Sequence, residues 1–237
     1  MKRRVVVTGP VSYTHLDKLR KKNPHLKIYD IHSEEFKKFG RVSDLDCSEM
    51  IRYMEENTEI PQEGHYYIPD DEKMHNFSLY QKAKEENYGL MDIELGYCNG
   101  HSNYLNGLEY HKTNEFNIAV TDMVIFLGMV QDIQEGKFDT SHAKAFFVAK
   151  GEVVELYQTS MHYAPVEVYK SGFKCGVILQ KGTNEITGIV DQNATGEKRM
   201  LFKKNTWLMV HPDYEEFVAL GAYPGICGEN FKIDPLD

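Results

Sequence analysis

The chain has 237 residues, of which 36 are acidic and 27 basic, so its formal net charge is −9. A chain of this length can bury a sizeable core without disulfides, and its acidic balance argues against nucleic acid or an anionic membrane as a partner. The four cysteines lie far apart with no CxxC pair, and the sequence has no signal-peptide region and no run of about 18 apolar residues, so we expect a reduced, soluble, cytoplasmic protein.

The beginning of the chain differs in character from the rest. Residues 10–16, Pro-Val-Ser-Tyr-Thr-His-Leu, are what one reading frame of a transposon-end adaptor used in sequencing libraries would encode. We therefore predict that residues 1–16 are a non-native segment and that residues 17–237 form a single domain. The alternative is a genuine strand over residues 4–9 that opens a nucleotide-binding fold, but no GxGxxG or P-loop pattern follows it.

Residues 17–89 mix helical and extended patterns. Capping and breaking residues, such as Ser33 before one charged run and Gly40 after it, mark the ends of several elements. The predicted helices cover residues 17–22, 33–40 and 48–57, and the predicted extended segments cover residues 26–31 and 63–71. We expect this part to be an α/β embellishment of the main fold, with His65 and His75 at the surface.

From about residue 90 the pattern becomes all-β. Short apolar runs recur with glycine, asparagine and serine between them, which is typical of a sandwich or barrel and not of a parallel α/β sheet. The runs cover residues 120–127, 145–149, 153–157, 166–169, 175–179, 201–202 and 207–210.

Residues 108–115 and 160–165 contain the candidate site. Glu109, His111 and Glu115 have the same parity, so on one extended strand their side chains would point to the same face. Three such groups on the inward face of a small barrel must coordinate something or line a wet pocket. His162, in Ser-Met-His-Tyr-Ala-Pro, would supply a fourth group from another strand.

Two histidines with carboxylates suit a divalent first-row metal that keeps open positions, here Mn, Fe, Ni or Zn. Such an ion can polarise a carbonyl or enediolate oxygen while a carboxylate moves protons. His101, Lys150 and Tyr163 are the candidate substrate-binding residues, and Lys150 or Lys181 could meet a carboxylate or phosphate. The alternative is structural: Glu109 and Glu115 would form cross-strand ion pairs on a solvent face, and His111 would be a hydrogen-bonded core or surface histidine. We expect His142 and His211 at the surface.

The spacing Glu109-x-His111-x-x-x-Glu115 resembles the first cupin motif, with Glu109 where its first histidine stands. Residues 159–165 resemble the second cupin motif around its final metal-binding histidine, and residues 17–230 as a whole resemble an uncharacterised bacterial cupin family, a domain of unknown function. More distantly, residues 108–165 resemble ureidoglycolate lyase, in which a tryptophan stands at the position of Met161. The resemblance implies a mainly β, RmlC-like cupin fold: an antiparallel β-barrel (jelly roll) over residues 90–237, decorated by residues 17–89. It also implies a homodimer.

The leading functional hypothesis is a metal-dependent isomerase or lyase that acts on a small polar carbonyl compound, such as a sugar, a sugar phosphate or a ureido acid. In it Glu109, His111, Glu115 and His162 hold the ion, or one carboxylate is the general base. The alternative is a non-catalytic metabolite- or sugar-binding cupin. A third possibility is oxygen-dependent chemistry at iron.

Overall fold

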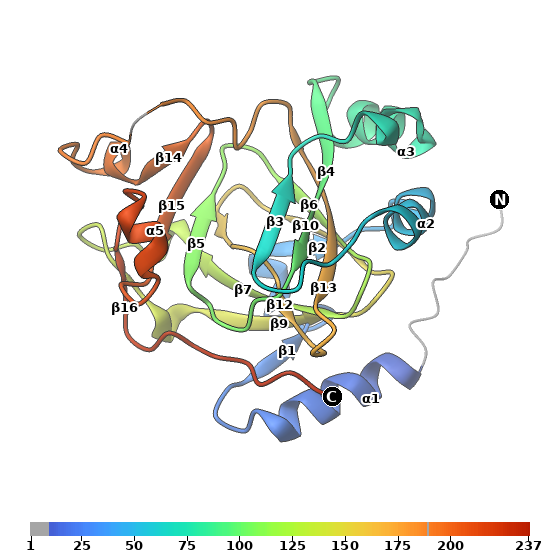
Figure 1. The fold of residues 1–237 in the computed structure, drawn as a ribbon, viewed down its shortest axis with the longest axis horizontal. Coiled ribbons are helices and arrows are strands. Elements are labelled where there is room, and N and C mark those ends of the chain that lie inside the picture. The colour runs from blue at the N-terminus through green and yellow to red at the C-terminus, as the bar shows by residue number, and fades with distance from the viewer. Residues whose placement is uncertain (1–9, 189) are drawn as a thin grey trace.

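A computed structural model describes residues 10–188 and 190–237, and the fold in this part of the chain is mainly β with several sheets (Figure 1). The α-helices are α1 (Pro10–Lys22), α2 (Ser48–Asn57), α3 (Ser78–Lys82), α4 (Glu197–Met200) and α5 (Glu215–Ala219). Short 3-10 turns are η1 (Phe36–Lys38), η2 (Glu72–Asn76), η4 (Val130–Asp132) and η5 (Thr140–His142), and η3 (Ala83–Asn87) is a π-helical turn. In this part of the chain no helix combines the length and the apolar character that crossing a bilayer requires.

The strands fall into two larger and two smaller sheets. The six-stranded sheet has the order β2 (Gly40–Val42), β10 (Val153–Leu156), β6 (Glu115–Ala119), β13 (Phe173–Gln180), β4 (Ile93–Gly100), β3 (His65–Ile68). The five-stranded sheet has the order β1 (Ile28–Asp30), β9 (Lys144–Val148), β7 (Met123–Met129), β11 (Ser160–Met161), with β12 (Val166–Glu167) also paired to β7. The smaller sheets are β14 (Leu201–Lys203), β15 (Thr206–Val210), β5 (Gly107–Tyr110), and β16 (Ile226–Cys227) with β8 (Phe138–Asp139).

The predicted closed barrel is not confirmed. The pairing among the described residues leaves every sheet open, and two of the pairs, β1 with β9 and β16 with β8, are parallel. The N-terminal part supplies edge strands to both larger sheets, because β1 pairs with β9 while β2 and β3 pair with β10 and β4. It is therefore joined to the main fold through hydrogen-bonded strands.

The two larger sheets pack face to face, with helices on the outside. Strand β7 shows the alternation: Ile125 and Leu127 pack with residues of the six-stranded sheet, whereas Val124 and Phe126 pack in the cluster that includes Leu16 and Leu19 of α1. Helices α2 and α3 cover the other face of the six-stranded sheet (Figure 1). On β6, Phe116 and Ile118 therefore face the helices, whereas Glu115, Asn117 and Ala119 face the other sheet.

Most predicted elements from residue 48 onward are present with shifted ends, and the predicted helix 48–57 coincides with α2. The predicted helix over residues 33–40 is wrong: only η1 forms, and Gly40 begins β2. Gly40 serves close packing, since a Cβ there would overlap the carbonyl oxygen of Glu155 on β10. The predicted non-native segment lies partly in residues 1–9, outside the described residues; from Pro10 the chain is helical, and the prediction stays a prediction.

Candidate metal centre and cavity

Glu109 and His162 lie directly opposite each other on adjacent backbone segments. The Glu109 amide donates to the His162 carbonyl at 2.6 Å, and the His162 amide donates to the Glu109 carbonyl at 2.9 Å. Their flanking residues Leu108, Tyr110 and Met161 are buried in the apolar core. Because neighbouring residues of an extended chain face opposite ways, Glu109 and His162 project away from that core.

The single strand expected over residues 109–115 is wrong. Strand β5 ends at Tyr110, a bend at Lys112 and Thr113 follows, and β6 begins at Glu115 in a different sheet. The three side chains still converge, because the chain crosses from the three-stranded sheet to the six-stranded sheet between them. Shared parity along one strand is therefore not the reason for their proximity.

His111 is held by a backbone contact and presents its other nitrogen to the site. Its Nδ1 lies 2.8 Å from the carbonyl oxygen of Asn205, and because a carbonyl only accepts, Nδ1 carries the proton. Its Nε2 is buried and has no hydrogen-bond partner among the described residues, although Glu115 Oε2 is 3.2 Å away. Metal-ligating histidines are commonly oriented in this way, with the far N–H on a backbone carbonyl and the other nitrogen toward the site.

Glu115 lies between the two histidines. Its Oε2 is 3.2 Å from the Nε2 atoms of both His111 and His162, and its Oε1 accepts a hydrogen bond from Asn117 Nδ2 at 2.7 Å. Burial favours the neutral acid, but His162 and then His111 hold the pKa of Glu115 well below its usual range. Burial likewise disfavours charge on His111, yet Glu115 raises the pKa of His111 to about 8.

His111, Glu115 and His162 therefore form a compact group: all three side chains are buried, and each offers a ligand atom within 4.8 Å of the others. Glu109 lies just outside this group, with its Oε1 3.9 Å from His111 Nε2 and its side chain 17% exposed. Of the four predicted metal ligands, three are adjacent to one another and the fourth is beside them.

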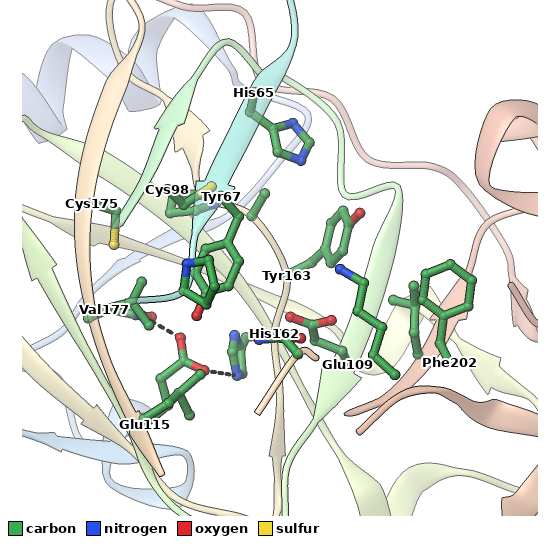
Figure 2. Close-up of a pocket in the computed structure, with 18 of the residues that line it drawn as sticks. His65, Tyr67, Cys98, Glu109, Glu115, His162, Tyr163, Cys175, Val177 and Phe202 are labelled. Carbon is green, nitrogen blue, oxygen red and sulfur yellow. Dashed lines mark hydrogen bonds and ion pairs between the residues drawn. The ribbon is translucent and has the colours of Figure 1, made fainter. Parts of the chain in front are cut away.

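A cavity of about 770 Å³ opens beside this group (Figure 2). Its polar lining residues are His65, Tyr67, Glu109, Glu115, Asn117, His162, Tyr163, Asn184, Glu185 and Lys203, and its other lining residues are Pro69, Cys98, Ala164, Pro165, Cys175, Val177, Leu179, Ile186, Phe202, Leu208 and Phe217. The volume is in the range of pockets for small molecules.

Of the three predicted substrate-binding residues, Tyr163 alone lines this cavity. Its ring makes edge contacts with the rings of His65, Tyr214 and Phe217. His101 is paired elsewhere, with its Nδ1 2.6 Å from Glu167 Oε2, and Lys150 forms an exposed ion pair with Glu55. Neither of these two residues lines the cavity.

The sequence reasoning missed several residues of the site. Tyr67 of β3 lines the cavity, and its buried hydroxyl has no hydrogen-bond partner in the described structure. Figure 2 shows its ring reaching from β3 toward Glu115 and His162. Asn117 lies two positions after Glu115 on the inward face of β6. This spacing could have identified Asn117 as a site residue from the sequence. Asn205 could have been found only as the turn residue between the runs 201–202 and 207–210, where its φ is +53°.

The family described as "Domain of unknown function (DUF4867)" matches residues 28–231. The chain belongs to this family. The predicted relationship to a domain of unknown function is thereby confirmed. No curated protein matches the DUF4867 chain, so its predicted resemblance to ureidoglycolate lyase has no support from these comparisons.

Several solved structures are distantly similar to the DUF4867 chain. A variant of Bacillus subtilis oxalate decarboxylase has 15% sequence identity and a TM-score of 0.32, covering 54% of this chain and 28% of that chain. Another oxalate decarboxylase structure has 15% identity and a TM-score of 0.34, and the match again covers 54% of this chain and 28% of that chain. A third structure, whose title concerns Mn(II) centres in the Bacillus subtilis enzyme, has 15% identity and a TM-score of 0.32, again over 54% and 28%. The matched region spans 28% of the length of these chains, and likeness this distant assigns neither an activity nor a metal here.

Proposed function

We propose that this protein is a metal-dependent cupin enzyme, an isomerase or lyase that acts on a small polar carbonyl compound. The observation that carries the proposal is the buried His111 Nε2, which has no hydrogen bond within the described part of the chain and lies 3.2 Å from Glu115 Oε2, close to His162. A buried polar atom without a partner is costly, and a bound cation would satisfy it together with the other two groups.

The residues present fit a divalent ion. Two imidazoles and one carboxylate suit Mn, Fe, Ni or Zn, and the hydrogen bonds from His111 to Asn205 and from Asn117 to Glu115 orient two of the three ligands. A bound ion of this kind would supply Lewis-acid polarisation of a substrate oxygen.

The protein's own groups supply the rest of the chemistry. Glu109 lines the cavity beside the three ligands and is the proposed general base that removes or returns a proton next to the carbonyl. Burial, with nearby Glu115, raises the pKa of Tyr67 well above its ordinary value, so its hydroxyl stays protonated. Tyr67 is thus able to donate a hydrogen bond to a substrate oxygen in the cavity.

The test is elemental analysis of the purified protein beside a His111→Ala, His162→Ala double variant. The parent should hold about one equivalent of Mn, Fe, Ni or Zn, and the double variant should hold none because two of three ligands are gone. A double variant of the surface histidines, His25→Ala with His142→Ala, is the matched control and should keep the metal. Circular dichroism checks that each variant is folded.

Turnover is tested separately with sugars, sugar phosphates and ureido acids. Glu109→Gln should keep the metal and lose at least about a hundredfold in kcat, which is the usual effect of removing a general base. A parent without metal after incubation with all four ions would overturn the metal centre. A metal-loaded parent that binds these compounds without converting any of them would favour the binding protein instead.

A further inference from the structure

Lys203, at the end of β14, is part of the cavity wall although no sequence pattern singled it out. The pairing of β14 with β15 shifts register between Leu201 and Lys203. Successive residues of a regular strand face opposite sides, but both Phe202 and Lys203 line the cavity. A local irregularity of this kind redirects a side chain, and here it turns a cation toward the cavity.

The charge of Lys203 is not balanced by the protein. Across residues 10–188 and 190–237, no carboxylate forms an ion pair with its ammonium and no hydrogen-bond acceptor is paired with it. Three carboxylates line the same cavity: Glu185 pairs with Lys204 at 2.7 Å, Glu115 lies between two histidines, and Glu109 Oε1 lies 3.9 Å from His111 Nε2. Lys203 is therefore available to an anion that enters the cavity.

The other lining residues bear on which anion Lys203 can bind. Phe202, Leu208, Phe217 and Ile186 line the same cavity, and apolar walls lower the local dielectric and strengthen an ion pair. Burial lowers the pKa of His65, so this neighbouring lining residue adds no second cation at neutral pH. A single lysine matches a carboxylate better than a phosphate dianion, which normally recruits several donors.

We propose that Lys203 binds the carboxylate of a small hydroxy- or oxo-acid substrate, whose other oxygen reaches the part of the cavity lined by Glu109, Glu115 and His162. This inference rests on the proposed function and narrows its substrate class to acids: sugar acids and ureido acids are included, and neutral sugars are excluded.

The test compares binding of acids with that of their uncharged counterparts by calorimetry. The probe pairs are gluconate with glucose and lactate with lactamide, measured on the protein as purified and at one ionic strength. At least one acid should bind about tenfold or more tightly than its neutral counterpart, as expected for one ion pair in an apolar setting. Lys203→Met should remove this preference, and Lys203→Arg should retain most of it.

The matched control is Lys198→Met, because Lys198 is an exposed lysine that pairs with Asp191 and does not line the cavity. It should bind like the parent. Metal content is measured in every variant and should be unchanged, because Lys203 is not a ligand. If no acid binds better than its neutral counterpart, or if Lys203→Met keeps the preference, the inference is overturned. Acid preference through Lys203 in a protein that never takes up metal would overturn the metal centre and leave the Lys203 site standing.

Discussion

Glu94 of β4 is a buried carboxylate that the candidate site does not use. Its Oε2 accepts a hydrogen bond from the Gly182 amide at 2.8 Å, while its Oε1 is buried without a hydrogen-bond partner in the described structure. Burial, together with the nearby charges of Asp70 and Glu185, raises the pKa of Glu94 from 4.5 to about 7.

This raised pKa predicts a loss of stability with rising pH. Between pH 4.5 and about 7 the unfolded chain releases the Glu94 proton before the folded chain does, so the free energy of unfolding falls across this window. The full loss is on the order of 3 kcal/mol, since one pKa unit corresponds to about 1.4 kcal/mol. Glu94→Gln is neutral throughout, so its advantage over the parent in urea unfolding should grow from pH 5 to pH 8.

Glu63→Gln, at an exposed position, is the control and should follow the parent at every pH. If Glu94→Gln also followed the parent, Glu94 would not be an energetically isolated buried acid.

Residue chemistry was the part of the site that the sequence predicted best. His111, Glu115 and His162 were predicted together with Glu109, because imidazoles and carboxylates on the inward face of a β fold have few structural uses. Tyr67 and Lys203 could not, since tyrosines and lysines are common in surface strands. Their proposed roles depend on the Tyr67 hydroxyl, which lacks a hydrogen-bond partner among the described residues, and on the register shift beside Lys203, and both are features of the tertiary structure.

At the scale of elements, the packing of β3 against β4 controls one wall of the cavity, because Tyr67 and Pro69 both line it. Gly96 of β4 allows this close approach: a Cβ at this position would overlap the backbone carbonyl oxygens of Ile68 and Pro69. Backbone atoms cannot rotate away as a side chain can, so the strands would have to separate.

Gly96→Ala should therefore lower the free energy of unfolding by about 3 kcal/mol or more, at or beyond the upper end of ordinary overpacking. Urea denaturation measures the loss. The control is Gly64→Ala, where no atom lies within 4 Å of the new Cβ and φ is +65°, so only backbone strain of about 1 to 2 kcal/mol is expected. Equal losses in the two variants would mean that the β3–β4 contact relaxes without cost.

The order of the elements was less predictable than their existence. Apolar runs with turn residues between them predicted strands near β7, β9, β10, β13 and β15, because burial and turn chemistry are local signals. The bend at Lys112 and Thr113 contains no glycine or proline, so the sequence pattern predicted one continuous strand over residues 109–115. Which sheet each strand joins depends on pairing between distant residues, and periodicity holds no information about it.

At the scale of the whole molecule, the candidate ligands come from three different sheets. His111 follows β5 of the three-stranded sheet, Glu115 begins β6 of the six-stranded sheet, and His162 follows β11 of the five-stranded sheet. One ion bound to all three would add a link between these sheets, beside the backbone hydrogen bonds that already join Glu109 of β5 to His162. Metal loading should consequently stabilise the entire chain.

The last prediction is the size of this effect. A ligand at a hundred times its Kd stabilises the folded state by about 2.7 kcal/mol, which for a chain of this length raises Tm by roughly 5 to 10 °C. Thermal unfolding with and without Zn or Mn should show this rise, and a chelator should reverse it. Asn117→Ala removes the hydrogen bond to Glu115, so its affinity should fall about 10- to 100-fold and its Tm should rise less at the same metal concentration.

Asn76→Ala changes an exposed asparagine outside the cavity and should keep the full rise, whereas His162→Ala should show none. The comparison with His162→Ala is needed because the chain carries a net charge of −9 and its surface carboxylates will attract divalent ions weakly. An equal rise of Tm in His162→Ala and the parent would assign the stabilisation to those surface groups. A rise confined to variants that keep all three ligands would instead require an ion to join the three sheets at His111, Glu115 and His162.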